Sequence, residues 1–470
     1  MSKFSGCIFS KGPNSMRSKI LIATLICASA GAALAEAGKA TFKIHGGSWL
    51  DAGKIVASHD SASNDGSDNS INLEGSWLET VGAQFTAVAD LNENLEGAFG
   101  FGAYKATHSL GRYNGNSKVK YYAISLFQNY LTEARLTYYV GDKNAPWLSF
   151  TLGSFNYTYN YDTKNLGSYL LRGPVYPGLL MGGFQDFSID STKSNVLGAR
   201  IHHATGNFSQ DLIFKNEYDL PPTFDWSLAY LAKYRMLDVI ELGAGVDFYR
   251  LLPYNSKLET PGHLAADGGK SVKADPVTND SVFLSHQGTK VMGMFALELN
   301  KFLGIGSLGP NDLKLYGEVA VLGLKNYGKT FDKISERMPM MVGFNLPTWG
   351  LLDFFSVEGE YYKSPYRNDL ANIGNLNLVA PWTVQLPNRP TPSPAPVTGP
   401  YPDSTRDNIK WSVNAQKTVA GHVKFIAQIA DDHYRPRPIA TGLISSTGGT
   451  AETFTTPKDW YYMIRVGYFF

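Results

Sequence analysis

The C-terminal segment, Trp460 to Phe470, places the narrowest limits on what this chain can fold into. Every second residue back from the end is apolar or aromatic: Phe470, Tyr468, Val466, Ile464, Tyr462 and Trp460. Arg465 lies between them. Because successive side chains of a strand point to opposite faces, Arg465 points away from an uncharged face with aromatic residues at both ends. That pattern is typical of a membrane-barrel strand, with lipid outside and a polar lumen inside. The alternative is an amphipathic edge strand of a soluble sandwich.

The N-terminal region predicts export. Met16-Arg17-Ser18-Lys19 precedes the apolar run Ile20 to Ala32, and Ala33-Leu34-Ala35 follows it. A basic start, an apolar run and an A-x-A site are the three parts of a signal peptide. We therefore expect residues 1–35 to be removed, with Met16 as a plausible true start. The alternative of a lipid anchor on Cys27 is weakened by the bulky Ile26 before it.

Composition excludes several classes of protein. The chain has 47 Gly, 27 Tyr and 26 Phe, only 18% charged residues, and a mean hydropathy of −0.18. A helical membrane protein would be more apolar, and a disordered chain would lack the aromatic residues. The net charge of +1 gives no basic footprint for nucleic acid. Cys7 and Cys27 both precede the predicted cut, so we expect no disulfide, Cys-bound metal or cysteine nucleophile in the mature chain.

Residues 36–470 read as a single all-β domain of about sixteen strands with turns between them. The connections fall into two interleaved classes. Short turns are expected at 90–94, 141–146, 205–206, 237–238, 302–311, 346–352 and 420–421. Long connections are expected at 54–70, 105–127, 158–195, 253–289, 364–408 and 435–458. This alternation predicts a transmembrane antiparallel β-barrel with short periplasmic turns and long extracellular loops.

A period of two recurs within the strands. Ile409, Trp411 and Val413 alternate with Lys410 and Ser412, and the segments beginning at Leu313, Phe355 and Ile240 show the same pattern. The outward faces lack charge, as expected where a central Lys or Arg would cost about 2–4 kcal/mol in lipid. Glu79 is the exception, since it is in phase with Trp77 and Val81. A bulge or an edge position would each explain it.

The signal peptide, the terminal Phe470, the strand number and the long connection after the fifth strand together resemble the general porins of Gram-negative outer membranes. The resemblance concerns architecture only, because the PEFGG-like loop signature is missing and Leu179 to Phe184 is a loose echo of it. It implies that residues 158–195 fold into the lumen and set its narrowest point. It also implies recognition of the last strand by the barrel-assembly machinery, and a homotrimer.

The candidate constriction contains charges on both the connection and the wall. On the connection they are Asp162, Lys164, Arg172, Asp186 and Asp190. By phase, the wall supplies the cations Arg135, Arg200, Lys233, Arg235, Lys424 and Arg465 and the acids Glu133, Glu241, Glu318, Glu358 and Glu360. Carboxylates facing cations across a lumen create a field that orients permeating solutes. The alternative is that many of these groups pair with one another along the wall.

Four tyrosines of the same region leave a second question open. Tyr157, Tyr159, Tyr161 and Tyr169 could stack on sugar rings in a sugar-selective channel, or pack within the loop. The first reading gives them a role in transport, and the second gives them a role in holding the loop together.

The remaining motifs predict no enzyme, no cofactor and no metal site. Gly304 to Gly309 matches G-x-G-x-x-G, but Pro310 and another alternating segment follow it, so we predict a turn rather than a dinucleotide site. His202 and His203 lie on opposite faces of a strand and cannot share a metal. There is no H-E-x-x-H and no G-x-S-x-G. The Pro-rich run 387–402 predicts a stiff, extended surface segment.

These observations predict a passive diffusion channel for small hydrophilic solutes in the Gram-negative outer membrane. A barrel this wide cannot fill its interior with wall side chains alone. The expected partners are outer-membrane lipid, lipopolysaccharide and the permeating solutes, with no nucleic acid. The alternatives are a barrel serving as a surface anchor or adhesin, and a lipase-like barrel with a Ser/His pair on its lipid face.

Overall fold

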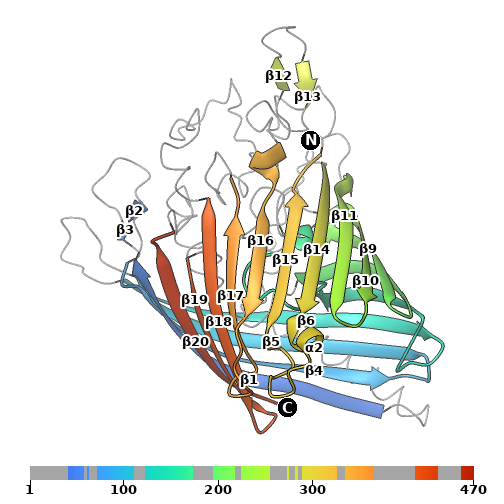
Figure 1. Cartoon of the computed structure of the whole chain (residues 1–470), viewed down its shortest axis with the longest axis horizontal. Coiled ribbons are helices and arrows are strands. Elements are labelled where there is room, and N and C mark those ends of the chain that lie inside the picture. The colour runs from blue at the N-terminus through green and yellow to red at the C-terminus, as the bar shows by residue number, and fades with distance from the viewer. Residues whose placement is uncertain are drawn as a thin grey trace, which may run out of the picture.

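The computed structural model describes residues 41–57, 61–62, 71–72, 74–110, 122–172, 194–217, 224–253, 272–274, 281–283, 288–324, 334–363, 408–431 and 457–470. Sixteen antiparallel strands close into one barrel (Figure 1). They are β1 (Thr41–Ala57), β4 (Trp77–Asp90), β5 (Leu95–Leu110), β6 (Tyr122–Val140), β7 (Leu148–Tyr157), β8 (Ser194–Thr205), β9 (Phe208–Glu217), β10 (Asp225–Met236), β11 (Ile240–Leu252), β14 (Gly288–Glu298), β15 (Lys314–Val321), β16 (Met340–Asn345), β17 (Phe354–Tyr361), β18 (Ile409–Val419), β19 (Val423–Ala430) and β20 (Trp460–Phe469). The predicted fold class is confirmed.

The barrel closes where β1 pairs with β20. The pairing runs from Gly47 opposite Phe469 to Ala57 opposite Trp460, with one irregularity near its end. On the inner face Arg465 donates two parallel hydrogen bonds to Asp51, from Nε to Oδ1 at 2.6 Å and from Nη2 to Oδ2 at 2.8 Å. Both side chains are buried. Such a two-bond pair fixes the register of the seam as well as adding energy.

The two faces of the wall differ as the alternation predicts. Along β20 the burial changes residue by residue, with Ile464 and Val466 exposed on the outside and Met463 and Arg465 buried on the inside. The same holds on the neighbouring strands, where exposed outward side chains include Leu50, Val81, Phe85, Leu152, Val319, Val357 and Phe425. An apolar surface continuous over so many strands requires apolar surroundings, because in water it would drive association.

Three strands extend further than the sequence analysis predicts. β1 continues to Ala57, β5 to Leu110, and β6 begins at Tyr122. The expected connections at 54–70 and 105–127 are therefore wrong in their bounds. Lys54 and Lys105 place a charge on the outward face of β1 and β5, where the sequence analysis expects these strands to end, yet the hydrogen-bonded sheet continues past both. The added residues of β6, Tyr122 to Phe127, are mostly apolar.

Extending the strands explains the exception at Glu79. Its pairing with Ala52 and Thr107 is regular, so there is no bulge, and its side chain is exposed on the outside. Lys54 and Lys105 lie on the same outer face at the same ends of β1 and β5. Glu79 is the third residue of β4. A charge at the end of a strand costs far less than one in the middle of an apolar band.

The connections sort to two ends of the barrel. All seven at one end lie within the described residues: 91–94, 141–147, 206–207, 237–239, 299–313, 346–353 and 420–422. In Figure 1 the chain terminus marked C and the five-residue helix α2 (Leu299–Leu303) lie at this end. The opposite end carries most of the longer connections, although 218–224 is shorter than 299–313.

The smaller elements are not part of the barrel sheet. Two short hairpins are formed by β2 (Ser61–Ala62) with β3 (Ile71–Asn72), and by β12 (Val272–Ala274) with β13 (Ser281–Phe283). Residues 71–72, which follow the expected connection at 54–70, belong to the first hairpin and not to the wall. Gly304 to Gly309 forms a turn after α2, as predicted. Within the described ranges, no helix is long and apolar enough to cross a membrane.

The tightest turns use left-handed backbone conformations. Between β18 and β19, Ala420 has φ 51° and Gly421 has φ 73°. Two successive positive φ values are the signature of the hairpin turn whose twist matches the flanking strands, and its first position prefers Asn. Ala420 has a Cβ that disfavours this conformation by about 1–2 kcal/mol.

We expect Ala420→Asn to stabilise the barrel by about 1 kcal/mol, because Asn tolerates the left-handed conformation and Ala does not. The measurement is the denaturant midpoint of the refolded protein in detergent micelles. Gly421→Ala is the matched control and should lower the midpoint. An unchanged or lower midpoint for Ala420→Asn would show that the turn is not strained.

Asp312 lies in the connection 299–313, the longest of the seven at this end of the barrel. Its carboxylate accepts hydrogen bonds from the Gly309 backbone at 2.9 Å, the Thr348 hydroxyl at 2.9 Å and the Trp349 backbone at 3.0 Å. The turn between β14 and β15 is thereby joined to the turn between β16 and β17. Burial opposes ionisation, but these hydrogen bonds outweigh it and hold the pKa of Asp312 below its usual range.

A lowered pKa in the folded state means that the stabilisation is present above the unfolded pKa and is lost as the pH falls through the folded one. We expect Asp312→Asn to lower the unfolding free energy at pH 7 by about 1–3 kcal/mol. The difference from the unsubstituted protein should shrink below about pH 4. Denaturant titrations at pH 7, 5 and 3 measure it. A difference that stays constant to pH 3 would contradict the role of the carboxylate charge.

Candidate functional site: the segment inside the barrel

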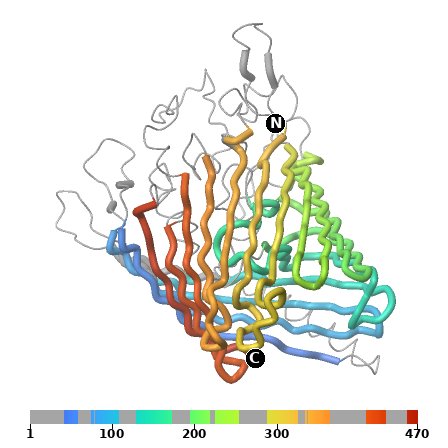
Figure 2. Tube along the Cα trace, viewed as in Figure 1, coloured from blue at the N-terminus to red at the C-terminus, as the bar shows by residue number. Residues whose placement is uncertain are grey.

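The segment that follows β7, residues 158–172, turns into the interior of the barrel. Its short 3-10 helix η1 (Tyr169–Leu171) lies against β11, β14 and β15. In Figure 2 its green-blue trace curls behind the strands at the front. Residues 173–193 lie outside the described part of the chain, so of the predicted constriction loop, residues 158–195, the structure describes 158–172 and 194–195.

Glu318 on β15 holds the segment at two points. Its carboxylate accepts hydrogen bonds from the Tyr159 hydroxyl and, at 3.1 Å, from the Asn160 side chain. It also accepts from the backbone N–H groups of Ser168 at 3.0 Å and Tyr169 at 2.7 Å. One buried acid thus joins the start of the segment to η1.

Glu358 on β17 holds the middle of the segment. It accepts from three successive backbone N–H groups, Lys164 at 2.6 Å, Asn165 at 2.9 Å and Leu166 at 2.9 Å. Its fourth donor is the Tyr316 hydroxyl at 3.0 Å. Hydrogen bonds to a charged acceptor are about twice as strong as neutral ones. The N–H groups of an irregular segment need such partners when they are buried.

Two further contacts fix the helical end. The Tyr169 hydroxyl donates to Glu360 at 2.6 Å. Lys290 Nζ donates to the carbonyl oxygens of Leu170 at 2.9 Å and Arg172 at 2.6 Å. Lys290 is itself 3.5 Å from Asp247. The sequence analysis did not single out Lys290, although its inward phase next to apolar Met292 and Met294 was a usable signal.

An apolar cluster fills the space between the segment and the wall. It consists of buried side chains from both: Phe155, Tyr157, Tyr159, Leu166, Tyr169, Leu170, Leu171, Val196, Ile213, Ala229, Leu231, Met292, Met294, Ala296, Tyr316, Ala320, Leu322, Met341 and Tyr362. Burying each large apolar side chain contributes roughly 1.5–3 kcal/mol. The segment is therefore part of the folded core and is not draped over it.

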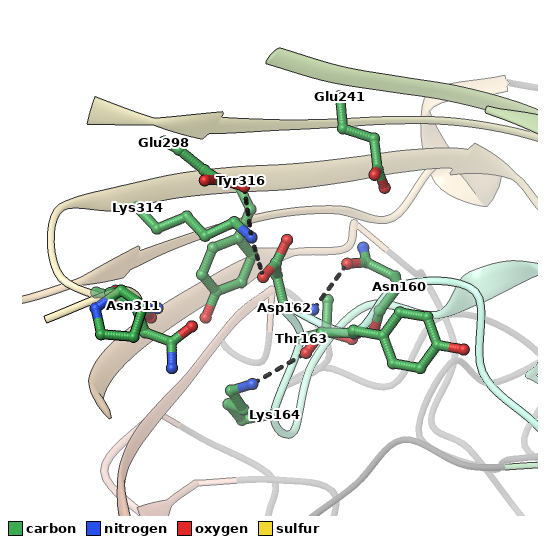
Figure 3. A network of polar contacts seen from close by, with 12 residues as sticks. Asn160, Asp162, Thr163, Lys164, Glu241, Glu298, Asn311, Lys314 and Tyr316 are labelled. Carbon is green, nitrogen blue, oxygen red and sulfur yellow. Dashed lines mark hydrogen bonds and ion pairs between the residues drawn. The ribbon is translucent and has the colours of Figure 1, made fainter. Parts of the chain in front are cut away.

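The charged residues predicted on the connection have different surroundings. Asp162 pairs with Lys314 of β15 at 2.7 Å, as Figure 3 shows. The ammonium of Lys164 lies 4.5 Å from the ring centroid of Phe354. Arg172 is fully buried and donates to the carbonyl oxygens of Gly167 and Asn165. It holds the segment together and does not face a passage. Asp186 and Asp190 lie outside the described residues.

The cations predicted on the wall lie on its inner face, and most of them pair with an acid. The contacts are Arg135 with Glu96 at 2.8 Å and with Glu133 at 2.9 Å, Arg200 with Asp211 at 2.7 Å, Lys233 with Glu241 at 3.2 Å, Arg235 with Glu298 at 2.6 Å, and Arg465 with Asp51 at 2.6 Å. Lys424 lies 5.3 Å from the ring centroid of Phe469. These contacts match the alternative given in the sequence analysis, in which the charged groups pair with one another along the wall. The predicted acids Glu318, Glu358 and Glu360 instead accept hydrogen bonds from the inner segment.

Exposure separates two groups of inner charges. Lys215, Asp247, Arg250 and Asp225 are almost completely buried. The side chains of Arg200, Lys233 and Glu241 keep 28%, 19% and 28% of their surface exposed. Only the second group can meet a solute without unfolding. Sequence reasoning missed the acids Asp51, Asp211 and Glu298, which could have been found from their inward phase on strands next to the predicted cations.

The described residues contain no group of three or more His, Asp or Glu side chains arranged to hold a metal ion. His202 faces inward, with its Nδ1 2.8 Å from Asp211 Oδ1. The ring centroid of His203 lies 6.2 Å from that of Trp147. The two rings are on different faces, as predicted.

Comparison with solved structures returns porins. A Rhodopseudomonas blastica porin mutant aligns with 92% of this chain and all of its own length, at 9% identity and a TM-score of 0.39. Pseudomonas putida OprB, in a low-pH structure, aligns with 91% of this chain and 92% of its own, at 9% identity and a TM-score of 0.44. No protein-family model and no curated protein matches the chain. The architecture predicted from the sequence, a closed barrel of sixteen antiparallel strands, is confirmed by the structure of this chain itself.

The clasp formed by Glu318 and Glu358 can be tested by labelling. Leu166 is fully buried beneath the segment. With Cys7 and Cys27 replaced by Ser, a Leu166→Cys variant should react slowly with a thiol reagent. Adding Glu318→Ala and Glu358→Ala should raise the rate by about tenfold or more, because losing about 1.4 kcal/mol of local stability makes the open state ten times more populated.

The matched control is Glu96→Ala, which removes another inner glutamate that does not contact the segment. It should leave the labelling rate of Leu166→Cys unchanged. Equal rates in the clasp variant and the control would show that the apolar cluster alone holds the segment.

Proposed function

We propose that this protein is an outer-membrane porin, a passive diffusion channel for small hydrophilic solutes that is narrowed by the segment inside its barrel. The observation that carries the proposal is the clasp: residues 159–169 are held against β15 and β17 by hydrogen bonds to buried acids. A sixteen-strand barrel is too wide for wall side chains to fill. A segment fixed on one side of it narrows the lumen and leaves the opposite wall lined by polar groups.

The apolar outer wall supports a membrane location. The signal peptide predicted at residues 1–35 supports export, and we place the end of the barrel with the seven described turns toward the periplasm and the other end toward the cell surface. In this placement outer-membrane lipid and lipopolysaccharide surround the wall. The aromatic end of β20 is the element that we propose the barrel-assembly machinery recognises. A homotrimer is part of the same proposal, because it follows from the resemblance to porins. We propose a channel and not an enzyme.

Reconstitution in a planar bilayer tests the channel directly. We expect stepwise current increases of uniform size, and larger steps for the Glu318→Ala, Glu358→Ala variant because its segment no longer narrows the lumen. Glu96→Ala is the control for the loss of a wall acid. An absence of current steps from correctly folded protein would overturn the proposal and favour a surface anchor or adhesin.

A further inference from the structure

Tyr161 differs from the three other tyrosines at the end of β7 and in the inner segment. Tyr157, Tyr159 and Tyr169 are buried to 4%, 1% and 0% exposure, and their hydroxyls bond to Asp211, Glu318 and Glu360. They cannot offer a ring face to a solute. Tyr161 is 72% exposed. The sequence left open whether these tyrosines pack within the loop or face a solute. In the structure Tyr157, Tyr159 and Tyr169 are packed, and Tyr161 is exposed.

The backbone that carries Tyr161 is fixed on both sides. Tyr159 precedes it and donates to Glu318, while the backbone of Lys164 follows it and donates to Glu358. Lys164 Nζ also donates to the Tyr161 carbonyl oxygen at 3.0 Å, and Asp162 is paired with Lys314. An exposed ring on a rigid support loses little entropy when a ligand stacks on it, which is what a preorganised site requires.

The wall beside this ring carries charges that alternate from strand to strand. Arg200 lies on β8, Asp211 on β9, Lys233 on β10 and Glu241 on β11. Lys233 Nζ is 5.7 Å from the Tyr161 ring centroid and donates to the Tyr159 carbonyl at 3.1 Å. Arg200 lies 5.1 Å from the ring centroid of Tyr157, at the end of the strand from which this segment starts. Figure 3 shows the Glu241 side chain pointing from its strand toward the segment that carries Asn160 and Asp162.

We infer that Tyr161, with Arg200, Lys233 and Glu241, forms a binding site for neutral ring sugars passing through the lumen. A pyranose has an apolar C–H face that stacks on an aromatic ring and hydroxyls that need donors and acceptors in alternation. Tyr161 supplies the first. Arg200 and Lys233 supply donors, and the Glu241 carboxylate supplies acceptors. This inference rests on the proposed channel function and names its solute class.

Charge balance favours a neutral ligand over an ion. Each cation of the proposed site already contacts an acid, Arg200 with Asp211 at 2.7 Å and Lys233 with Glu241 at 3.2 Å. A free anion would have to compete with these carboxylates. A sugar hydroxyl can instead bridge a pair, taking a hydrogen bond from the cation and donating one to the acid, so that all partners stay satisfied.

The test is block of KCl current through the reconstituted protein by maltose. We expect saturable block of the unsubstituted channel, and similar block of Tyr161→Phe, which keeps the ring. Tyr161→Ala should need about tenfold more maltose, the equivalent of one lost stacking contact. Tyr230→Ala is the matched control, because Tyr230 is on the outward face of β10 and bonds to Gln210. It should leave the block unchanged.

Mannitol, an acyclic polyol with no ring face, separates stacking from simple hydrogen bonding. It should block weakly and equally in all variants. A conducting channel that maltose does not block, or blocks equally in Tyr161→Ala, overturns the sugar site but leaves the channel standing. Block by gluconate that exceeds block by maltose would identify an anion site instead, and would also overturn the inference. If the protein is not a channel, no variant will give current even before maltose is added, so this outcome is distinct from loss of the sugar site. Because Tyr161 is exposed, none of these substitutions removes a core contact.

Discussion

Closure of the sheet is the constraint on which the rest of the structure depends. An open strand edge leaves a row of backbone groups without partners, and within a membrane there is no water to satisfy them. Here the first and last strands complete the ladder: Gly46 N–H bonds to Phe470 O at 3.0 Å, and Phe470 N–H bonds to Gly46 O at 2.9 Å. The Asp51–Arg465 pair repeats the match in side chains across the same seam. Once the ring is closed, alternation along each strand gives an apolar exterior and a polar interior.

A closed ring of sixteen strands creates a second requirement, because its interior must be either filled or wet. Residues 158–172 fill part of it with Leu166, Tyr169 and Leu170, but an irregular segment carries backbone N–H groups that no strand satisfies. Glu318 and Glu358 accept five of them. Removing either acid would leave buried donors unpaired, and removing the N–H groups would leave a buried charge. The segment and these acids therefore depend on each other.

Much of this was predictable because it follows from a period of two. The closed barrel, the inward phase of Arg465 and Glu318 and the inward position of the segment all follow from alternation or from the porin resemblance. The clasp was not predictable, because Glu358 meets Lys164 through a fold that brings together residues 194 positions apart. Nor could phase distinguish Arg172, which is buried within the segment, from Lys233, which stays partly exposed. Phase tells which face a side chain occupies, but not what covers that face. The ends of β1 and β5 were predicted too early for a related reason. Lys54 and Lys105 each put a charge on the outward face, but the hydrogen-bonded ladder continues past them.

The interior is asymmetric, and the asymmetry decides where selection among solutes can occur. On the side of β15 and β17 the acids are occupied by the segment and withdrawn from water. On β8, β10 and β11, Arg200, Lys233 and Glu241 are each in an ion pair yet remain partly exposed. Paired charges produce only a weak net field, so they discriminate poorly by charge, but each pair still offers a donor and an acceptor at a fixed separation. In the proposed channel, hydrogen-bonding geometry beside the exposed Tyr161 ring is then a stronger basis for selection than the net charge of +1 that the whole chain carries.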